Sequence, residues 1–315
     1  MRGGRWLCGA GLFLLLMGFF AITGVFGSSP DYPIVGNRSA ALFFSVVLAY
    51  IVPVFHFISA RTAAVITQLG ADLPDPTTLA RLHARVHHKP RNWYGAVIAI
   101  GLGAAIAHNA ALAADEAIHA DVLIVWLAMV IGTTLVWVVL TIVIAALIDN
   151  ALLLNRLAHQ VRINPLAVER LQPFAAVAVL STLSIVGLQA AFPIMILDEA
   201  INAVAFVPGL IATIIPIAVL ALLPIWPLHT RLRATKAQLL DEINARIATQ
   251  PLPTPDESRP ISELLPLLAW RREIQGLPEW PFDVGTVGRL IFYLIIPPLT
   301  WVGAALIERL VESTL

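Results

Sequence analysis

Cysteine and charged residues are both scarce in this chain of 315 residues. The one cysteine, Cys8, excludes an intrachain disulfide and any cysteine-based metal site. Charged residues make up 13% of the sequence and apolar residues 58%, and the mean hydropathy is +0.83. Such a composition excludes an ordinary soluble globular protein and favours a chain that crosses a membrane several times.

The apolar stretches also lack ionisable residues at their centres. Proton- or sodium-coupled carriers usually place an acidic or basic side chain at mid-membrane, where it is costly to keep and therefore functional. The absence of such residues weakens the case for an ion-coupled carrier, and it argues against an intramembrane catalyst based on Asp or Glu. We therefore expect no enzymatic activity and no cofactor.

Seven apolar stretches of 19 to 27 residues can be drawn, and each is long enough to cross a bilayer as a helix. Alternating segments of about ten residues, which transmembrane β-strands require, are not visible. The predicted fold is an all-α polytopic bundle with spans at 6–26, 40–58, 94–114, 122–148, 173–197, 203–226 and 287–307.

The distribution of basic residues predicts the orientation of these spans. Of the 20 Lys and Arg residues, 18 fall on one side of the predicted membrane and two, Arg38 and Arg309, fall on the other. Because cytoplasmic loops carry the excess of positive charge, the amino terminus is predicted inside and the carboxyl terminus outside. The first span follows Arg2 and Arg5 and has features of a signal peptide, but its apolar run is too long for one, so we expect it to be retained.

The spans divide the chain into three predicted parts. Residues 1–226 form a bundle of six spans, and residues 287–315 form the seventh span and an external end. Between them, residues 227–286 contain an apolar stripe within 228–247, a proline-rich linker and a second short helix. This middle part is predicted to be a cytoplasmic helical hairpin that returns to the membrane along the interface.

A weak resemblance covers the last quarter of the chain. The segments PLHTRLRATKAQL and LPEWPFD, with GRLIFYLIIPPLTWVGAALIE after them, resemble stretches of uncharacterised bacterial multipass membrane proteins. The resemblance implies residence in a bacterial inner membrane and carries no activity.

Prolines interrupt the sixth and seventh spans. Each proline removes one backbone donor and crowds the carbonyl four residues earlier, so these helices should be kinked or broken. Broken membrane helices form gates and binding sites in transporters, although proline kinks also serve packing alone. The candidate gating positions are Pro208, Gly209, Pro216, Pro224, Pro297 and Pro298.

Polar side chains inside the spans are few, and they are the candidates for intramembrane binding: His56, His108, Asn109 and Gln189. A histidine there could act as a proton-responsive switch. The favoured alternative is a bond to a backbone carbonyl released by a nearby proline, such as Pro53 before His56.

Arginines and a histidine recur just below the membrane in three internal connections. Together they could line a pocket for an anionic headgroup or metabolite, because the arginine fork suits phosphate and carboxylate. The inside excess of positive charge predicts arginines there in any case. The candidate residues are Arg81, His83, Arg85, Arg156, His159, Arg162, His229, Arg231 and Arg233.

A metal site is not predicted from the histidines. His83 and His87 share one helical face, but a third ligand and the glutamate of the zinc-protease pattern are missing nearby.

Two functions are compatible with these features. The first is a transporter- or channel-like protein that passes or binds a small solute or ion, with the broken spans as mobile elements. The alternative is a regulatory membrane protein that recruits a cytoplasmic partner through the 228–247 helix. Lipid and further copies of the chain are the other expected partners, and nucleic acid is not expected.

Overall fold

The structure, a computed structural model, describes residues 4–27, 37–70, 76–113, 123–197, 207–249 and 259–281, together with the single positions 288, 292 and 295. Within these ranges all regular structure is helical and no strand occurs. The predicted seventh span, including Pro297 and Pro298, lies outside the described residues apart from those single positions.

The described ranges hold long helices joined by short ones, in an order that follows the predicted spans. In chain order they are α1 (Gly4–Ile22), α2 (Asn37–Gly70), α3 (Pro76–His87), α4 (Arg91–Ala113), α5 (Leu123–Gln160), the 3₁₀ helix η2 (Pro165–Leu171), α6 (Gln172–Gln189), the 3₁₀ helix η3 (Phe192–Leu197), α7 (Val207–Leu222), α8 (Trp226–Ala248) and α9 (Arg259–Gly276).

Five segments are long and apolar enough to cross a membrane, and they correspond to the predicted spans two to six. The first predicted span gives a shorter apolar helix, Trp6–Ile22. A helical chain with segments long and apolar enough to cross a membrane is therefore confirmed, while the crossing itself, the count of seven and the orientation stay predictions. The five segments are Arg38–Leu69, Leu79–Ala113, Leu123–Gln160, Pro165–Met195 and Val207–Ala248.

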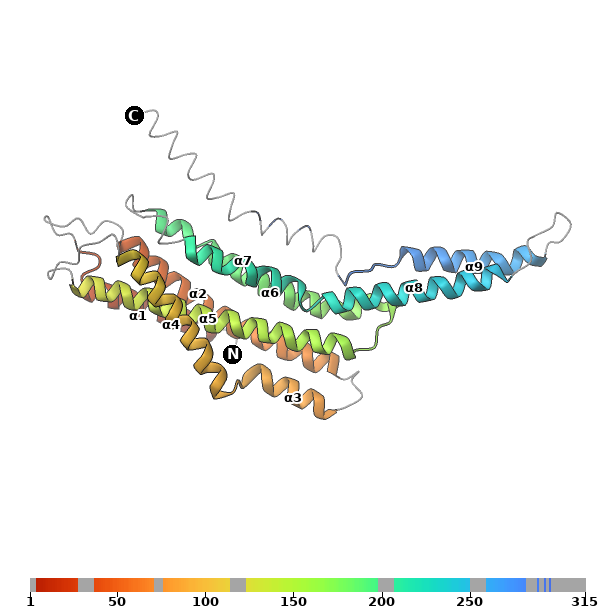
Figure 1. Cartoon of the computed structure of the whole chain (residues 1–315), viewed down its shortest axis with the longest axis horizontal. Helices are drawn as coiled ribbons and strands as arrows, with labels where there is room; N and C mark the ends of the chain where they lie inside the picture. Colours follow the sequence, from red (N-terminus) through yellow and green to blue (C-terminus); the bar gives the residue numbers. More distant parts are fainter. Residues whose placement is uncertain are drawn as a thin grey trace, which may run out of the picture.

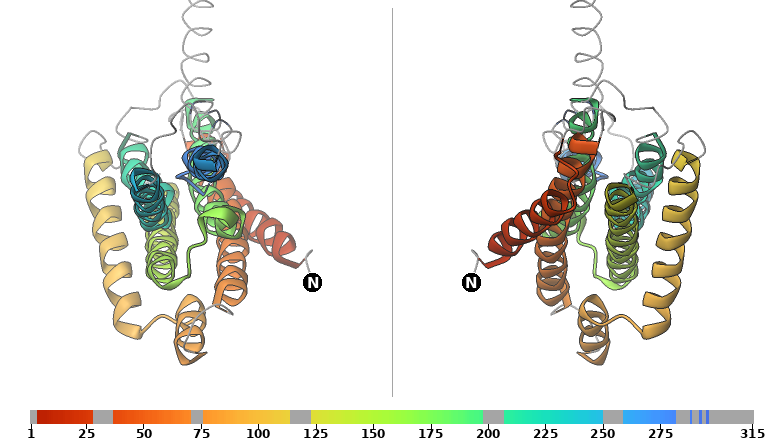
Figure 2. Two further views of the ribbon diagram at one scale, coloured as in Figure 1. Left: turned by 90° about the vertical axis from the view of Figure 1, so that its right-hand side faces the viewer. Right: turned by 90° about the vertical axis from the view of Figure 1, so that its left-hand side faces the viewer.

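The helices form an elongated bundle with α2 and α5 at its centre. These two helices pack against each other, and α2 also contacts α1 and α6, whereas α5 also contacts α4 and α7. Viewed along the bundle, α4 lies on one flank and α1 on the opposite flank (Figure 2). The pair α8–α9 projects beyond the bundle at the end where α3 lies (Figure 1).

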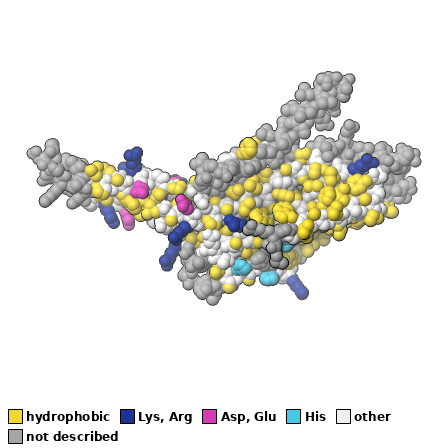
Figure 3. Space-filling model, turned by 180° about the vertical axis from the view of Figure 1, so that it is seen from behind, with side chains coloured by type: hydrophobic (Ala, Val, Ile, Leu, Met, Phe, Trp, Pro, Cys, Tyr) yellow, Lys and Arg dark blue, Asp and Glu magenta, His cyan; other side chains and the backbone are white. Residues whose placement is uncertain are grey.

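Side chains are most buried where the central helices meet and most exposed on the flanking helices. Leu154, Phe174 and Leu228 are fully buried in a core cluster that joins α2, α5, α6 and α8 near the projecting hairpin. The flanking helices instead expose large apolar side chains, for example Leu15 in α1 and Ile106 in α4. Figure 3 shows apolar side chains covering the bundle and charged side chains on the projecting hairpin. An apolar exposed belt of this extent suits lipid contact.

Glycine sets the distance between α4 and α5. A Cβ atom at Gly101 would lie 2.9 Å from the Cα of Val138, so only glycine allows this approach. Val97, Gly101 and Ala105 are the buried residues of α4 and are spaced by four, which is the pattern of small residues at close helix contacts. Gly103, in contrast, faces open space.

The fifth and sixth predicted spans are both interrupted. The fifth, 173–197, consists of α6, a turn after Gln189, and η3. The sixth, 203–226, is helical from Val207 to Leu222 and is followed by a turn at residues 223–225 that contains Pro224. Pro216 lies inside α7, so the chain breaks at the last of the evenly spaced prolines and not at the middle one.

Candidate functional site

A buried polar contact joins α6 to α7 beside the first interruption. Gln189, the last residue of α6, donates from Nε2 to Oγ1 of Thr213 at 2.7 Å, and that hydroxyl donates to the carbonyl of Leu210 at 2.7 Å. Gln189 and Thr213 are both buried. A side-chain amide and a hydroxyl are therefore hydrogen-bonded where α6 ends beside α7.

The second interruption is held together from α5. Pro227 has no N–H group, so the carbonyl of Leu223, four residues earlier, cannot receive its usual helical bond. Asn155 of α5 supplies the donor instead, with its Nδ2 at 2.6 Å from the Leu223 oxygen. The break between α7 and α8 is thus satisfied by a side chain from another helix, as a freed carbonyl in a lipid environment requires.

Arg231 of α8 ties the same region to the end of α5. Its Nη1 donates to the carbonyl of Ala158 at 2.6 Å and to that of Val161 at 2.9 Å. Ala158 lies in the last turn of α5 and Val161 directly follows the helix, where carbonyls have no further helical donors. The positive guanidinium also suits the negative end of the helix dipole. Arg231 therefore acts as a cap for α5.

His229 and Lys236 hold residues 277–281 against α8. The Nδ1 of His229 donates to the carbonyl of Glu279 at 2.9 Å, and the ring stacks on Trp280 with centroids 3.8 Å apart. Lys236 donates to the carbonyl of Leu277 at 3.0 Å and lies 3.3 Å from Oε1 of Glu279. The segment after α9 is therefore docked on α8, which itself packs against α9.

The remaining basic candidates do not gather into one pocket with Arg231. Arg85 pairs with Asp149 of α5 at 3.7 Å, and the same carboxylate bonds to Lys89. Arg81 and His83 lie on α3 with Arg85. The other four are exposed and lie near the end of α5 or on α8: Arg156, His159, Arg162 and Arg233.

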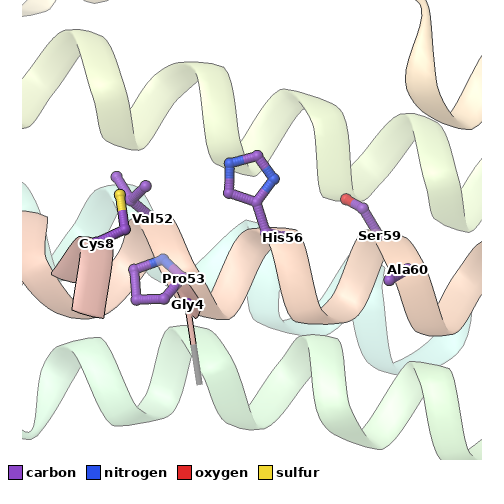
Figure 4. A pocket seen from close by; sticks show the side chains of 7 residues that line it. All are labelled: Gly4, Cys8, Val52, Pro53, His56, Ser59 and Ala60. Atoms are coloured by element: carbon purple, nitrogen blue, oxygen red, sulfur yellow. The ribbon is translucent and has the colours of Figure 1, made fainter. Parts of the chain in front are cut away.

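The intramembrane polar candidates lie in three separate places. Asn109 donates to the carbonyl of Ala105 within α4 at 2.9 Å, and the ring of His108 lies 5.8 Å from that of Trp137 in α5. Gln189 belongs to the contact between α6 and α7. His56 is exposed and lines an open crevice of about 380 Å³ between α1 and α2, shown in Figure 4.

The candidate gating positions that the structure describes fall on the segment from α7 to α8. Pro208 and Gly209 lie in the first turn of α7, where Gly209 packs close to the ring of Phe192 in η3. Pro216 and Pro224 are both buried. No group of three His, Cys, Asp or Glu side chains arranged to hold a metal ion occurs within the parts of the chain that the structure describes.

The sequence analysis did not identify the side chains that bond to the backbone where the helices are interrupted. Pro227 signals that the Leu223 carbonyl needs another donor, yet Asn155 lies 68 positions away along the chain and nothing local marks it as the partner. Lys89 and Asp149 are likewise 60 positions apart.

Comparison with protein-family models, with curated proteins and with solved structures finds no significant match for this chain. The functional argument therefore rests on the contacts of the chain itself.

Proposed function

We propose that this protein resides in a membrane and binds or passes a small solute or ion, with α7 and α8 moving against α5 and α6. The observation that carries the proposal is the pair of neighbouring interrupted helices, α6–η3 and α7–α8. Interrupted helices lying side by side form the binding and gating regions of many transporters. The proposal includes the predicted orientation, with the amino terminus in the cytoplasm of a bacterial cell.

The bonds at the interruptions suit such a role. A carbonyl that accepts from a side chain, as Leu223 accepts from Asn155, can exchange that donor without unwinding a helix. The hydrogen bond between the Gln189 amide and the Thr213 hydroxyl could likewise be exchanged for hydrogen bonds from these two groups to a polar solute. The turn at residues 223–225 is then the joint about which α8 moves relative to α7.

The hairpin formed by α8 and α9 would act as the lever on this joint. α8 spans 23 residues, or roughly 35 Å of helix. Arg231 attaches the beginning of this lever to the end of α5, and Asn155 of α5 bonds to Leu223 in the turn that precedes the lever. A movement of the hairpin would therefore change the hydrogen bonds at the end of α5 and at the turn at the same time.

A flux assay on liposomes tests the proposal. The purified protein is reconstituted, and the release of a panel of neutral solutes and salts is followed by light scattering and by ion-selective dyes. We expect at least one solute to leave faster than from empty liposomes. Thr213→Val, which removes the hydroxyl at nearly constant volume, should slow that release by roughly tenfold, equivalent to the loss of one buried hydrogen-bonding group.

Thr134→Val is the matched control, because the hydroxyl of Thr134 bonds only to the carbonyl of Val130 in its own helix. Its flux should equal that of the unmodified protein. Release no faster than from empty liposomes across the whole panel would contradict the proposal, and so would full flux in both Thr213→Val and Pro216→Ala.

A second candidate function is the recruitment of a cytoplasmic partner through the hairpin. The buried members of the 228–247 stripe are Leu228, Leu232 and Ile243, and the first two belong to the core cluster that α8 shares with the bundle. The large apolar side chains exposed on α9 are Leu265, Leu268 and Trp270, whereas on α8 only Trp226, which precedes the stripe, is exposed among the described residues. A partner would therefore meet α9 and not the stripe on α8. The flux assay separates the two functions, because a recruiting protein without a solute path leaves liposomes sealed.

A further inference from the structure

The crevice between α1 and α2 begins at a close contact beside Pro53. This proline removes the helical donor from the carbonyl of Ala49. Gly9 of α1 lies directly against that point: a Cβ atom there would be 2.6 Å from the Ala49 oxygen and 3.1 Å from Cγ of Pro53. α1 is inclined away from the rest of the bundle toward its amino terminus, as Figure 2 shows. The crevice is the wedge that this divergence leaves open.

Two polar side chains on one side of α2 line the wedge. His56 and Ser59 rise from the same side of the helix in Figure 4. The remaining lining is small or apolar and comes from both helices: Gly4, Cys8, Val52, Pro53 and Ala60. No carboxylate lines it, so the groups present favour an acceptor ligand over a cation.

Ser59 differs from the other hydroxyl residues of α2. Ser45, Thr62 and Thr67 each donate to the carbonyl four residues earlier, at 2.8 to 3.0 Å, as hydroxyls in membrane helices commonly do. The Oγ of Ser59 has no hydrogen-bond partner, although the residue is only 7% exposed. A buried polar atom without a partner is costly and calls for a ligand or ordered water at that point.

The arginines beside the crevice indicate where it lies relative to the headgroup layer of the membrane. Arg61 follows Ser59 by two residues, and Arg5 follows Gly4 directly. At 1.5 Å per residue, Ser59 lies about 3 Å and His56 about 7.5 Å along the helix from Arg61. Because arginine side chains reach the headgroup layer, these two residues stand at the boundary between headgroups and hydrocarbon.

We propose that this crevice binds the phosphate group of a membrane phospholipid. The imidazole N–H of His56 and the hydroxyl of Ser59 donate to the phosphate oxygens, and the glycerol and first acyl carbons lie along Cys8, Val52 and Pro53. A volume of about 380 Å³ suits a headgroup with its glycerol and leaves the acyl chains in the bilayer. A soluble phosphate ester offers the same acceptor oxygens, and the experiment distinguishes the two sources.

Cys8 provides a native reporter of occupancy, because it lines the crevice, is exposed and is the one cysteine of the chain. The purified protein in detergent is treated with a maleimide while phosphatidylglycerol is added in steps, and the rate of Cys8 modification is measured relative to the lipid-free rate of the same variant. We expect phosphatidylglycerol to slow the modification in a saturable manner.

His56→Ala should raise the lipid concentration that gives half protection by roughly tenfold, the effect of losing one hydrogen bond to a charged group. Ser59→Ala should raise it as well. Ser45→Ala is the control and should leave it unchanged, since its hydroxyl is bonded within α2. Equal half-protection concentrations in His56→Ala, Ser59→Ala and the unmodified protein would overturn the proposal.

Two further probes identify the ligand. Diacylglycerol with the same chains lacks the phosphate and should not protect Cys8, so equal protection by it would also overturn the proposal. Protection by inorganic phosphate alone would assign the site to a soluble phosphate compound, whereas protection by phosphatidylglycerol alone assigns it to the lipid. These readings do not depend on whether the protein passes a solute.

Discussion

Pro53 and Pro227 each release a backbone carbonyl, and the neighbouring helix responds differently at the two positions. At Pro53, α2 continues as a helix, and Gly9 of α1 lies against the released carbonyl of Ala49. At Pro227, beside the turn between α7 and α8, a side chain of α5 donates to the released carbonyl of Leu223. The contrast shows that proline only frees the carbonyl, and that the residue facing it decides what kind of contact forms there.

The two contacts also differ in how much movement they permit between the helices. Backbone packing against a glycine is short and tolerates little change, because any Cβ atom would collide with it. A side-chain donor can rotate away and be replaced. We therefore regard the α1–α2 contact as a fixed part of the bundle and the α7–α8 turn as its adjustable part.

Gly9→Leu tests the fixed contact and should have the largest effect. The new side chain would meet a backbone oxygen, so α1 must shift away, at a cost of about 3 kcal/mol in the free energy of unfolding. Thermal unfolding in detergent measures this. Gly11→Leu is the control, since nothing lies within 4 Å of a Cβ atom at Gly11, and it should unfold near the temperature of the unmodified protein.

Arg231→Met tests the attachment of α8 to α5 and should have an intermediate effect. Removing the guanidinium leaves the carbonyls of Ala158 and Val161 without this donor, and hydrogen bonds to charged groups contribute about 2 kcal/mol. Faster hydrogen exchange in the last turn of α5 would report the loss. Arg233→Met, at an exposed position two residues further on, should leave exchange there unchanged.

Asn155→Leu tests the turn itself and should have the smallest effect on stability, about 1 kcal/mol for one neutral hydrogen bond. Cleavage of residues 223–225 by a soluble protease, or their labelling after substitution with cysteine, would measure the exposure of the turn. Gln160→Leu, an exposed position at the end of α5, serves as the control. A loss of stability equal to that of Gly9→Leu would remove the distinction between a fixed and an adjustable contact.

The positions of the helices could be predicted from the sequence, but the contacts between them could not. Hydropathy predicted the apolar spans that became α2, α4, α5, α6 and α7, because length and the absence of charge are local properties. It drew residues 173–197 as one helix, since the turn after Gln189 lies in an apolar run with Pro193 as its one local signal. The proline spacing indicated an interrupted sixth span but did not indicate which proline would lie in the break.

The candidate site was predicted less completely. Basic residues on the cytoplasmic side are expected in any membrane bundle, so their positions could not reveal that Arg231 caps α5 or that Arg85 pairs with Asp149. Gly9 has no distinguishing context in its own span. Its role depends on Pro53 of another helix, and such a pairing follows only from the packed structure.

The ion pair between Lys89 and Asp149 has a consequence for how the protein is made. Lys89 precedes α4 and leaves the ribosome 60 residues before Asp149, which follows the apolar part of α5. The lysine side chain is only 5% exposed in the packed structure, although the carboxylate that pairs with it comes from a helix made later. Packing α4 against α5 therefore buries the charge of Lys89 and supplies its carboxylate in the same step, so a chain that stopped before Asp149 would leave that lysine without this partner.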